Sequence, residues 1–133
     1  MPLYLTMILV LGVIGLINTI YLSYHTITKE PVKCLFFPEE WCRKVQYSSY
    51  SRTFGIPNSF AGFFIYLAII ILTLAFTAGA TPFAPVVWII VIGLLFSVYF
   101  LFIQAFVLRA FCTWCVVSAV EFILLTLIIV FLR

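Results

Sequence analysis

Four long apolar runs dominate the chain, and short polar or turn-forming segments separate them. The runs cover residues 3–24, 57–77, 85–108 and 111–132. Each is long enough to cross a bilayer as a helix, which takes about 20 apolar residues. The pattern therefore predicts an all-α membrane protein, a bundle of four transmembrane helices in a single domain over residues 1–133.

The segments between the runs predict where the helices begin and turn. Pro57 and Pro85 are expected in the first turns of the second and third helices, where the missing N–H of proline has no intrahelical partner to lose. Residues 78–84 form an uncharged turn, and Arg109 begins a tight hairpin between the last two helices. No basic segment precedes the first run, so we expect it to be retained and not cleaved as a signal peptide.

The only long connection, residues 25–56, holds all the lysines and two of the four cysteines. Function concentrates in such loops when a rigid scaffold positions them. Within this loop, Pro38 followed by Glu39 and Glu40 resembles a helix start, because carboxylates are favourable at the positive end of a helix dipole. We expect a short helix here that lies on the membrane surface.

Composition agrees with a bilayer as the solvent. The chain is 66% hydrophobic and 8% charged, whereas a soluble domain carries about 25% charged residues. The net charge of +3 comes from residues that lie almost entirely outside the apolar runs. This charge indicates topology and excludes a nucleic-acid-binding surface, so the expected partners include membrane lipid and no nucleic acid.

Four spans place all four cysteines on one face of the membrane. The ends of helices one and three and the starts of helices two and four share that face, where Cys34, Cys42, Cys112 and Cys115 therefore gather. Cys112 and Cys115 form a C-x-x-C motif at a helix start, where unpaired N–H groups favour the reactive thiolate. This arrangement favours a redox relay by thiol–disulfide exchange.

Two non-redox alternatives remain for the cysteines. Zinc sites also use C-x-x-C, but seven residues separate Cys34 from Cys42, against a usual spacing of about two to four. Purely structural disulfides are disfavoured because a C-x-x-C bridge closes a short loop and stabilises little. Along the last helix, one stripe is formed against which a flat apolar electron acceptor could lie, and its residues are Cys112, Cys115, Ala119 and Phe122.

The motifs together resemble the vitamin K epoxide reductase family in its microbial, quinone-linked form. They are Cys-x7-Cys in the first loop, Ser48, Phe54-Gly55-Ile56-Pro57-Asn58-Ser59-Phe60-Ala61-Gly62, Gln104 and Cys112-Thr113-Trp114-Cys115-Val116-Val117-Ser118-Ala119. This set extends over almost the whole chain. Disulfide bond formation protein B differs, because its C-x-x-C lies in the first loop and its spaced pair in the second.

The resemblance implies a four-helix bundle that encloses a quinone of the menaquinone or ubiquinone type as electron acceptor. It implies that Cys115 reacts with the quinone, that Cys112 exchanges with Cys42, and that Cys34 meets a thioredoxin-like partner. Many bacterial relatives carry that partner as a fused domain, whereas this chain stops at Arg133. We therefore expect the thioredoxin-like protein to act in trans and substrate proteins to gain disulfides.

The same resemblance implies a quinone-binding set of Asn58, Ser48, Ala119 and Phe122 and no metal. Asn58 matches a residue that hydrogen-bonds a quinone carbonyl in the animal enzymes, and Ser48 matches a hydroxyl residue near the catalytic cysteines. Ala119 stands where those enzymes carry a tyrosine, which favours plain quinone over vitamin K epoxide as the substrate. Epoxide reduction is the enzymatic alternative, and a metal-binding or structural membrane protein is the non-enzymatic one.

Two polar residues inside the apolar runs are interpreted first as structural. Glu121 falls near mid-membrane and away from the cysteine stripe, so we favour a structural hydrogen bond, with Gln104 at similar depth, over a proton relay. Asn18 is interpreted as an interhelical hydrogen-bonding residue. Tyr21 and Trp41 are expected first in an interfacial aromatic belt.

The orientation in the membrane receives two opposing predictions. Positive residues on the cysteine face outnumber those on the other face, which favours a cytoplasmic position for the cysteines. These residues are Lys29, Lys33, Arg43, Lys44, Arg52 and Arg109. The family resemblance implies the extracytoplasmic face instead.

Overall fold

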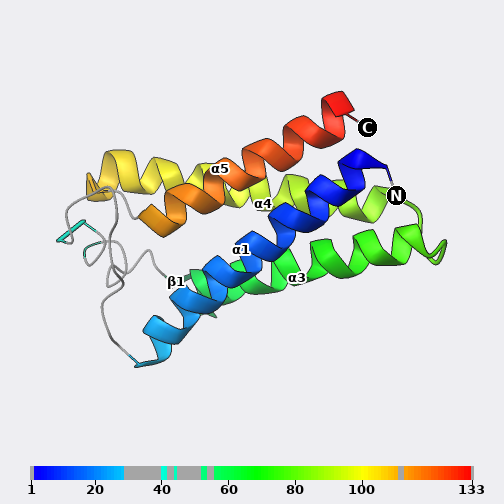
Figure 1. The fold of residues 1–133 in the computed structure, drawn as a ribbon. Helices are drawn as coiled ribbons and strands as arrows, with labels where there is room; N and C mark the ends of the chain where they lie inside the picture. The colour runs from blue at the N-terminus through cyan, green and yellow to red at the C-terminus, as the bar shows by residue number, and fades with distance from the viewer. Residues whose placement is uncertain are drawn as a thin grey trace.

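The computed structural model describes residues 2–28, 40–41, 44, 52–53, 56–110 and 113–132. Four long helices make up nearly all of this part of the chain (Figure 1). Their bounds are α1 Leu3–Thr28, α3 Asn58–Thr77, α4 Ala84–Phe102 with a π-helical continuation η2 Ile103–Leu108, and α5 Thr113–Leu127 with a π-helical continuation η3 Ile128–Leu132. Each of the four is long and apolar enough to cross a membrane, so the predicted four-helix membrane fold is confirmed.

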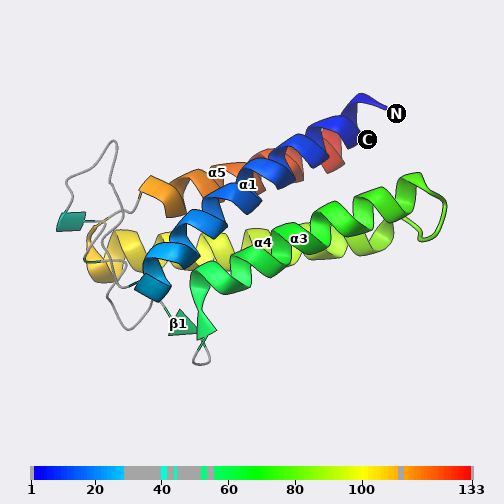
Figure 2. The ribbon, with the colours of Figure 1, turned by 60° about the horizontal axis from the view of Figure 1, so that its bottom comes forward.

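The helices run alternately up and down and close into a ring. α1 lies against α3 and α5, and α4 lies against the same two helices. Both chain termini and the turn from α3 to α4 lie at one end, which we call the termini end (Figure 1). The opposite end, which we call the cysteine end, holds the end of α1, the start of α3, η2 and the start of α5. Figure 2 shows the two-residue strand β1 (Arg52–Thr53) at the same cysteine end from a second direction.

The predicted helix starts are correct for one proline and wrong for the other. Pro85 lies in the first turn of α4, as expected. Pro57 lies before α3, in the two-residue strand β2 (Ile56–Pro57), which pairs antiparallel with β1 (Arg52–Thr53). Strand pairing keeps the backbone extended up to Pro57, and the helix begins one residue later at Asn58.

The first loop is described only in part. Glu40, Trp41 and Lys44 have helical conformation, within the segment for which a surface helix is predicted. The rest of that helix lies outside the described residues. At the other predicted turn, η2 ends at Leu108, and Arg109 adopts a left-handed conformation with φ of 52°.

An aromatic pair held between two glycines fills the centre of the bundle. The rings of Tyr66 on α3 and Phe122 on α5 stack with centroids 5.0 Å apart. A Cβ atom at Gly15 of α1 would overlap the Tyr66 ring, and one at Gly93 of α4 would overlap the Phe122 ring. The two glycines therefore make room for the aromatic pair, as small residues do at membrane helix interfaces.

Candidate functional site

Cys115 lies in the first turn of α5, half-buried at the cysteine end. It contacts a buried apolar cluster, which we call the cysteine-end cluster. Its members are Phe100, Ile103, Leu108 and Ala110, with Tyr21, Leu22, Trp41, Trp114 and Cys115 packed against them. The cluster thus joins α1, the first loop, α4 with η2, and the start of α5 around one cysteine.

Two side chains of α1 hold the C-x-x-C segment. The Asn18 side-chain amide donates a hydrogen bond to the Trp114 carbonyl oxygen over 3.0 Å. The Tyr21 ring packs on the Trp114 ring with centroids 4.8 Å apart and on His25 with centroids 4.5 Å apart. Asn18 is therefore an interhelical hydrogen-bonding residue, as predicted, and Tyr21 contacts the candidate site directly.

The predicted site residues divide into those that the structure describes and those that it does not. Cys34, Cys42, Ser48 and Cys112 lie outside the described residues. Cys115 and the half-buried Asn58, the first residue of α3, both lie at the cysteine end.

Ala119 and Phe122 lie deeper along α5, each only 3% exposed. Phe122 has its ring against Tyr66. Ala119 is one residue from Ser118, whose hydroxyl contacts the same tyrosine.

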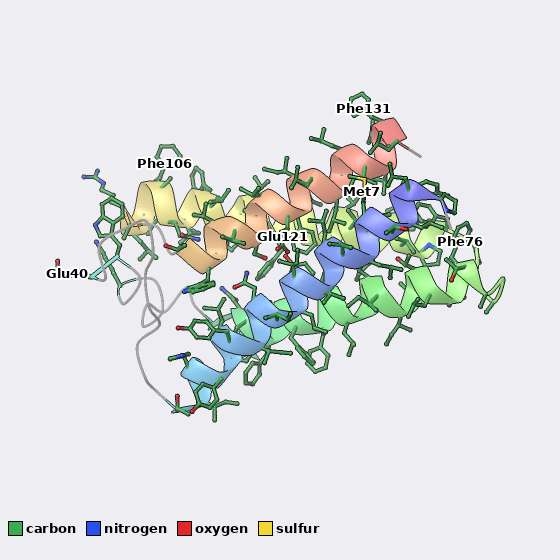
Figure 3. The ribbon with its side chains drawn as sticks, in the orientation of Figure 1. Met7, Glu40, Phe76, Phe106, Glu121 and Phe131 are labelled. Carbon is green, nitrogen blue, oxygen red and sulfur yellow. The ribbon has the colours of Figure 1, made fainter. Side chains whose placement is uncertain are left out.

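A polar cluster lies below Cys115, inside the bundle. The Tyr66 hydroxyl lies 2.7 Å from the Ser118 hydroxyl and also interacts with the Glu121 carboxyl group. Figure 3 shows Glu121 about midway along the bundle, between the helices. The partner that the structure shows for Glu121 is thus Tyr66 on α3, which the sequence pattern did not suggest.

The polar atoms at the cysteine end, which include donors and an acceptor, fit a quinone, whose two carbonyl oxygens accept hydrogen bonds and whose reduced form donates them. Buried polar atoms at this end have no hydrogen-bond partner among the described residues: Asn18 Oδ1, Ser23 Oγ and Ser59 Oγ. Hydroxyl groups can donate to a carbonyl oxygen, and an amide oxygen can accept from a reduced quinol. Because buried polar groups are normally satisfied, these atoms are suited to a polar ligand group between apolar walls.

The zinc alternative involves all four cysteines, of which the structure describes Cys115. In the part of the chain that the structure describes, no three His, Cys, Asp or Glu residues lie close enough together to hold a metal ion. Three of the four cysteines lie outside that part.

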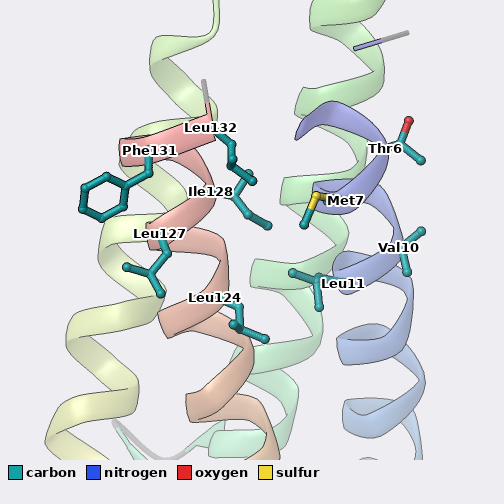
Figure 4. A pocket seen from close by; sticks show the side chains of 9 residues that line it. All are labelled: Thr6, Met7, Val10, Leu11, Leu124, Leu127, Ile128, Phe131 and Leu132. Atoms are coloured by element: carbon teal, nitrogen blue, oxygen red, sulfur yellow. The ribbon is translucent and has the colours of Figure 1, made fainter. Parts of the chain in front are cut away.

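A groove at the termini end contains no reactive side chain. It is an apolar groove of about 490 Å³ between α1 and the α5–η3 helix (Figure 4). Met7 and Leu11 project from α1 toward Leu124 and Ile128 across it. Leu124 is about 14 Å along the helix from Cys115, at about 1.5 Å per residue. The groove therefore offers space for a hydrocarbon chain and no reactive group.

Sequence reasoning gave no individual role to four residues that shape the site: Tyr66, Ser118, Gly15 and Gly93. Tyr66 lies in a uniformly apolar run, where a tyrosine gives no sign of which helix it faces. Gly15 and Gly93 carry the one available signal, since glycine inside a span often marks a close helix contact.

Comparison with known proteins identifies the family. The sequence profile of the vitamin K epoxide reductase family matches residues 6–131. No curated protein matches the chain. The family match covers the first loop and nearly all of the four helices, which are the regions that bear the cysteines and the polar cluster. The chain therefore belongs to the vitamin K epoxide reductase family and is a membrane-embedded oxidoreductase.

Proposed function

We propose that this protein oxidises the thiols of a thioredoxin-like partner and passes the electrons to a quinone. Cys34 and Cys42 receive the electrons from the partner, and Cys112 and Cys115 deliver them to the quinone. The observation that carries the proposal is the cysteine-end cluster, against which both Cys115 and Trp41 of the first loop pack.

The cluster supports a relay because it joins the two cysteine-bearing segments. Trp41 directly precedes Cys42 in the sequence, and Trp114 lies between Cys112 and Cys115. Both tryptophans pack against the same apolar core. Thiol–disulfide exchange requires a thiolate of one pair to reach a sulfur of the other, so segments that meet at one membrane boundary favour it.

The exchange balances in electrons and protons. A partner dithiol becomes a disulfide, and its two electrons reduce the first-loop disulfide. Thiols of this pair then reduce the Cys112–Cys115 disulfide, with Cys42 attacking Cys112. The new Cys112–Cys115 dithiol is oxidised in turn, which breaks two S–H bonds and forms one S–S bond. Two electrons and two protons leave with the quinone, whose chemistry is to accept both.

The chain's own residues position and enclose the reacting groups. Asn18 and Tyr21 fix the Trp114 segment, and with it the start of α5 that bears Cys115. Asn58 and Ser59 offer polar side chains at the start of α3 to hold a quinone oxygen. Ala119 offers no hydroxyl, so an epoxide oxygen would lack the tyrosine that the animal enzymes provide.

The test is quinol formation by the purified protein in lipid vesicles with a reduced thioredoxin-like protein and a ubiquinone or menaquinone analogue. Cys115→Ala should lose turnover by at least about a hundredfold, equivalent to about 2.7 kcal/mol. Val116→Ala, a truncation at the neighbouring half-buried position, is the matched control and should retain turnover. Normal turnover by Cys115→Ala would refute the assigned relay.

A parallel assay with vitamin K epoxide separates the two enzymatic alternatives. We expect quinone to be reduced and the epoxide to remain unchanged. Epoxide reduction at a comparable rate would show that a hydroxyl at position 119 is unnecessary and would favour the alternative.

The side of the membrane that bears the cysteines needs its own experiment. A membrane-impermeant thiol reagent applied to intact cells should modify Cys34 if the cysteines face outward, as the family resemblance implies. Labelling only after the membrane is permeabilised would place them in the cytoplasm, as the positive charges predict.

A further inference from the structure

One carboxyl group lies in the middle of the bundle without a role in the electron relay. Glu121 is only 4% exposed, and its Oε2 atom has no hydrogen-bond partner among the described residues. It is the only Asp, Glu, Lys or Arg within the four spans. An ionisable residue at such depth is costly, and for this reason it is a candidate for function.

The surroundings of Glu121 favour its neutral, protonated form. Tyr66 of α3 is the titratable group that faces it, and among the described residues neither α1 nor α4 places a charged group against it. A carboxylate in this position would have no Lys or Arg within the spans as a counter-ion, and an unpaired buried charge is costly in free energy.

A line of hydroxyl groups leads from this carboxyl group toward Cys115. Ser118 is one helical turn from Cys115 and one turn from Glu121 along α5. The Tyr66 hydroxyl lies 2.7 Å from the Ser118 hydroxyl and also interacts with Glu121. A hydroxyl both donates and accepts a hydrogen bond, so a proton can pass along such a line by exchange of bonds.

We propose that Glu121 is a proton-donating residue of this oxidoreductase, connected to the cysteine end through Tyr66 and Ser118. This inference rests on the proposed quinone reduction, which consumes two protons. Glu121 gives one proton toward the reduced quinone and regains one of the two released when the Cys112 and Cys115 thiols form a disulfide. The net result is unchanged: two S–H bonds break, one S–S bond forms, and two protons leave with the quinol.

The position of the predicted quinone-facing residues agrees with this role. Ala119 is the neighbour of Ser118 in the sequence, and Phe122 is the neighbour of Glu121. Phe122 also stacks on the ring of Tyr66, whose hydroxyl joins the two polar groups. The proton route and the proposed acceptor surface therefore occupy adjoining positions on α5.

The route can be tested without turnover, by infrared spectroscopy of the purified protein transferred into D₂O. A protonated Glu121 gives a carbonyl stretching band, which is assigned by its absence from the spectrum of Glu121→Gln. The frequency of this band shifts when deuterium replaces the carboxyl proton, so the rate of the shift measures proton exchange. We expect exchange to slow by about tenfold or more in both Tyr66→Phe and Ser118→Ala. Tyr66→Phe keeps the ring that stacks on Phe122, and Ser118→Ala removes a single oxygen.

Thr126→Val is the matched control for these variants. Thr126 lies on the same helix, and its hydroxyl donates to the Phe122 carbonyl oxygen of its own helix over 2.8 Å. Its loss should leave the exchange rate unchanged. The proposal would be overturned if the carboxyl proton exchanged at the same rate in the wild type, Tyr66→Phe and Ser118→Ala. It would also be overturned if this proton did not exchange in the wild type.

A single-turnover measurement separates this proposal from the proposed function. The pre-reduced protein is mixed with a quinone analogue, and quinol formation in Glu121→Gln should be slower by at least about tenfold. Disulfide exchange with the thioredoxin-like protein should keep its wild-type rate. Full-speed quinol formation in Glu121→Gln would overturn the proton role. If the wild type forms no quinol, the proposed function fails, while the exchange rates still decide whether the route exists.

Discussion

The two ends of the bundle differ in what their interiors contain. At the termini end, Tyr4, Phe76 and Phe83 interlock edge to face, and the groove beside them is apolar. From the middle to the cysteine end, the interior holds most of the buried polar residues: Asn18, Thr19, Gln104, Thr113 and Glu121. Lipid surrounds the bundle at both ends, so the surrounding solvent does not explain why one interior is more polar than the other.

A polar group buried within a bilayer is costly in free energy at any depth, because no water is present there to form hydrogen bonds with it. Their concentration near Cys115 therefore indicates a site, and the apolar termini end indicates a scaffold. Substitutions in the packed interior of the termini end should lower stability and leave chemistry intact. Substitutions at the cysteine end should change reactivity, with a smaller loss of stability.

The largest expected loss of stability comes from Phe83→Ala at the termini end. Phe83 is buried against Tyr4 and Phe76, and truncation of a buried phenylalanine costs about 3 kcal/mol or more. Unfolding in a denaturing detergent, followed by circular dichroism, measures the loss. The folded fraction should keep its thiol oxidation rate, and a lower rate per folded molecule would contradict the division between the ends.

The next largest effect is expected from Gly93→Ala at the centre, where the two regions meet. The added methyl group would overlap the Phe122 ring and force the aromatic pair apart, at a cost of about 1–3 kcal/mol. Gly62→Ala is the control, because its Cβ would meet only Thr19 Cγ2 at 3.0 Å. The same unfolding assay should rank Gly93→Ala as the less stable variant, and the reverse order would refute the central packing.

A smaller loss of stability, with a change in reactivity, is expected from Asn18→Ala at the cysteine end. Loss of the hydrogen bond to the Trp114 carbonyl should cost about 0.6 kcal/mol, a typical value between membrane helices. The loosened segment should expose Cys115, so its alkylation should be roughly threefold faster. Thr19→Val removes a hydroxyl bonded only within α1 and should leave the alkylation rate unchanged.

The smallest effect is expected from Leu127→Ala in the groove of the termini end. Leu127 is 46% exposed and lipid can replace its contacts, so stability should change by less than about 0.5 kcal/mol. Turnover should equal that of the wild type. A marked drop in turnover would show that the groove belongs to the site after all.

The sequence predicted the helices well because length and hydropathy alone decide which segments span a bilayer. Pro85 was placed correctly for a local reason, since proline fits the first turn of any helix. Pro57 was misplaced because its extended backbone depends on pairing with Arg52 of the neighbouring strand, and the rules for helix starts do not include strand pairing. Asn18 was recognised as an interhelical contact by residue type, but its partner, the Trp114 carbonyl, could not be named.

The site was less predictable because it depends on how the helices are rotated about their axes. The contact of Tyr66 with Ser118 joins α3 to α5 across 52 residues of sequence. In runs that are apolar on all sides, periodicity does not show which face points inward. The cysteine motifs indicated the chemistry, and only the structure showed which polar groups lie beside it.

The central claim is that the first-loop cysteines and the C-x-x-C pair exchange electrons at one membrane boundary. It is tested most directly by peptide mapping of Cys115→Ala under oxidising, non-reducing conditions with mass spectrometry. We predict a cross-linked peptide that joins Cys42 to Cys112, because the thiol that would resolve this bond is missing. Only a Cys34–Cys42 bridge, with Cys112 recovered as an unlinked thiol, would contradict the relay.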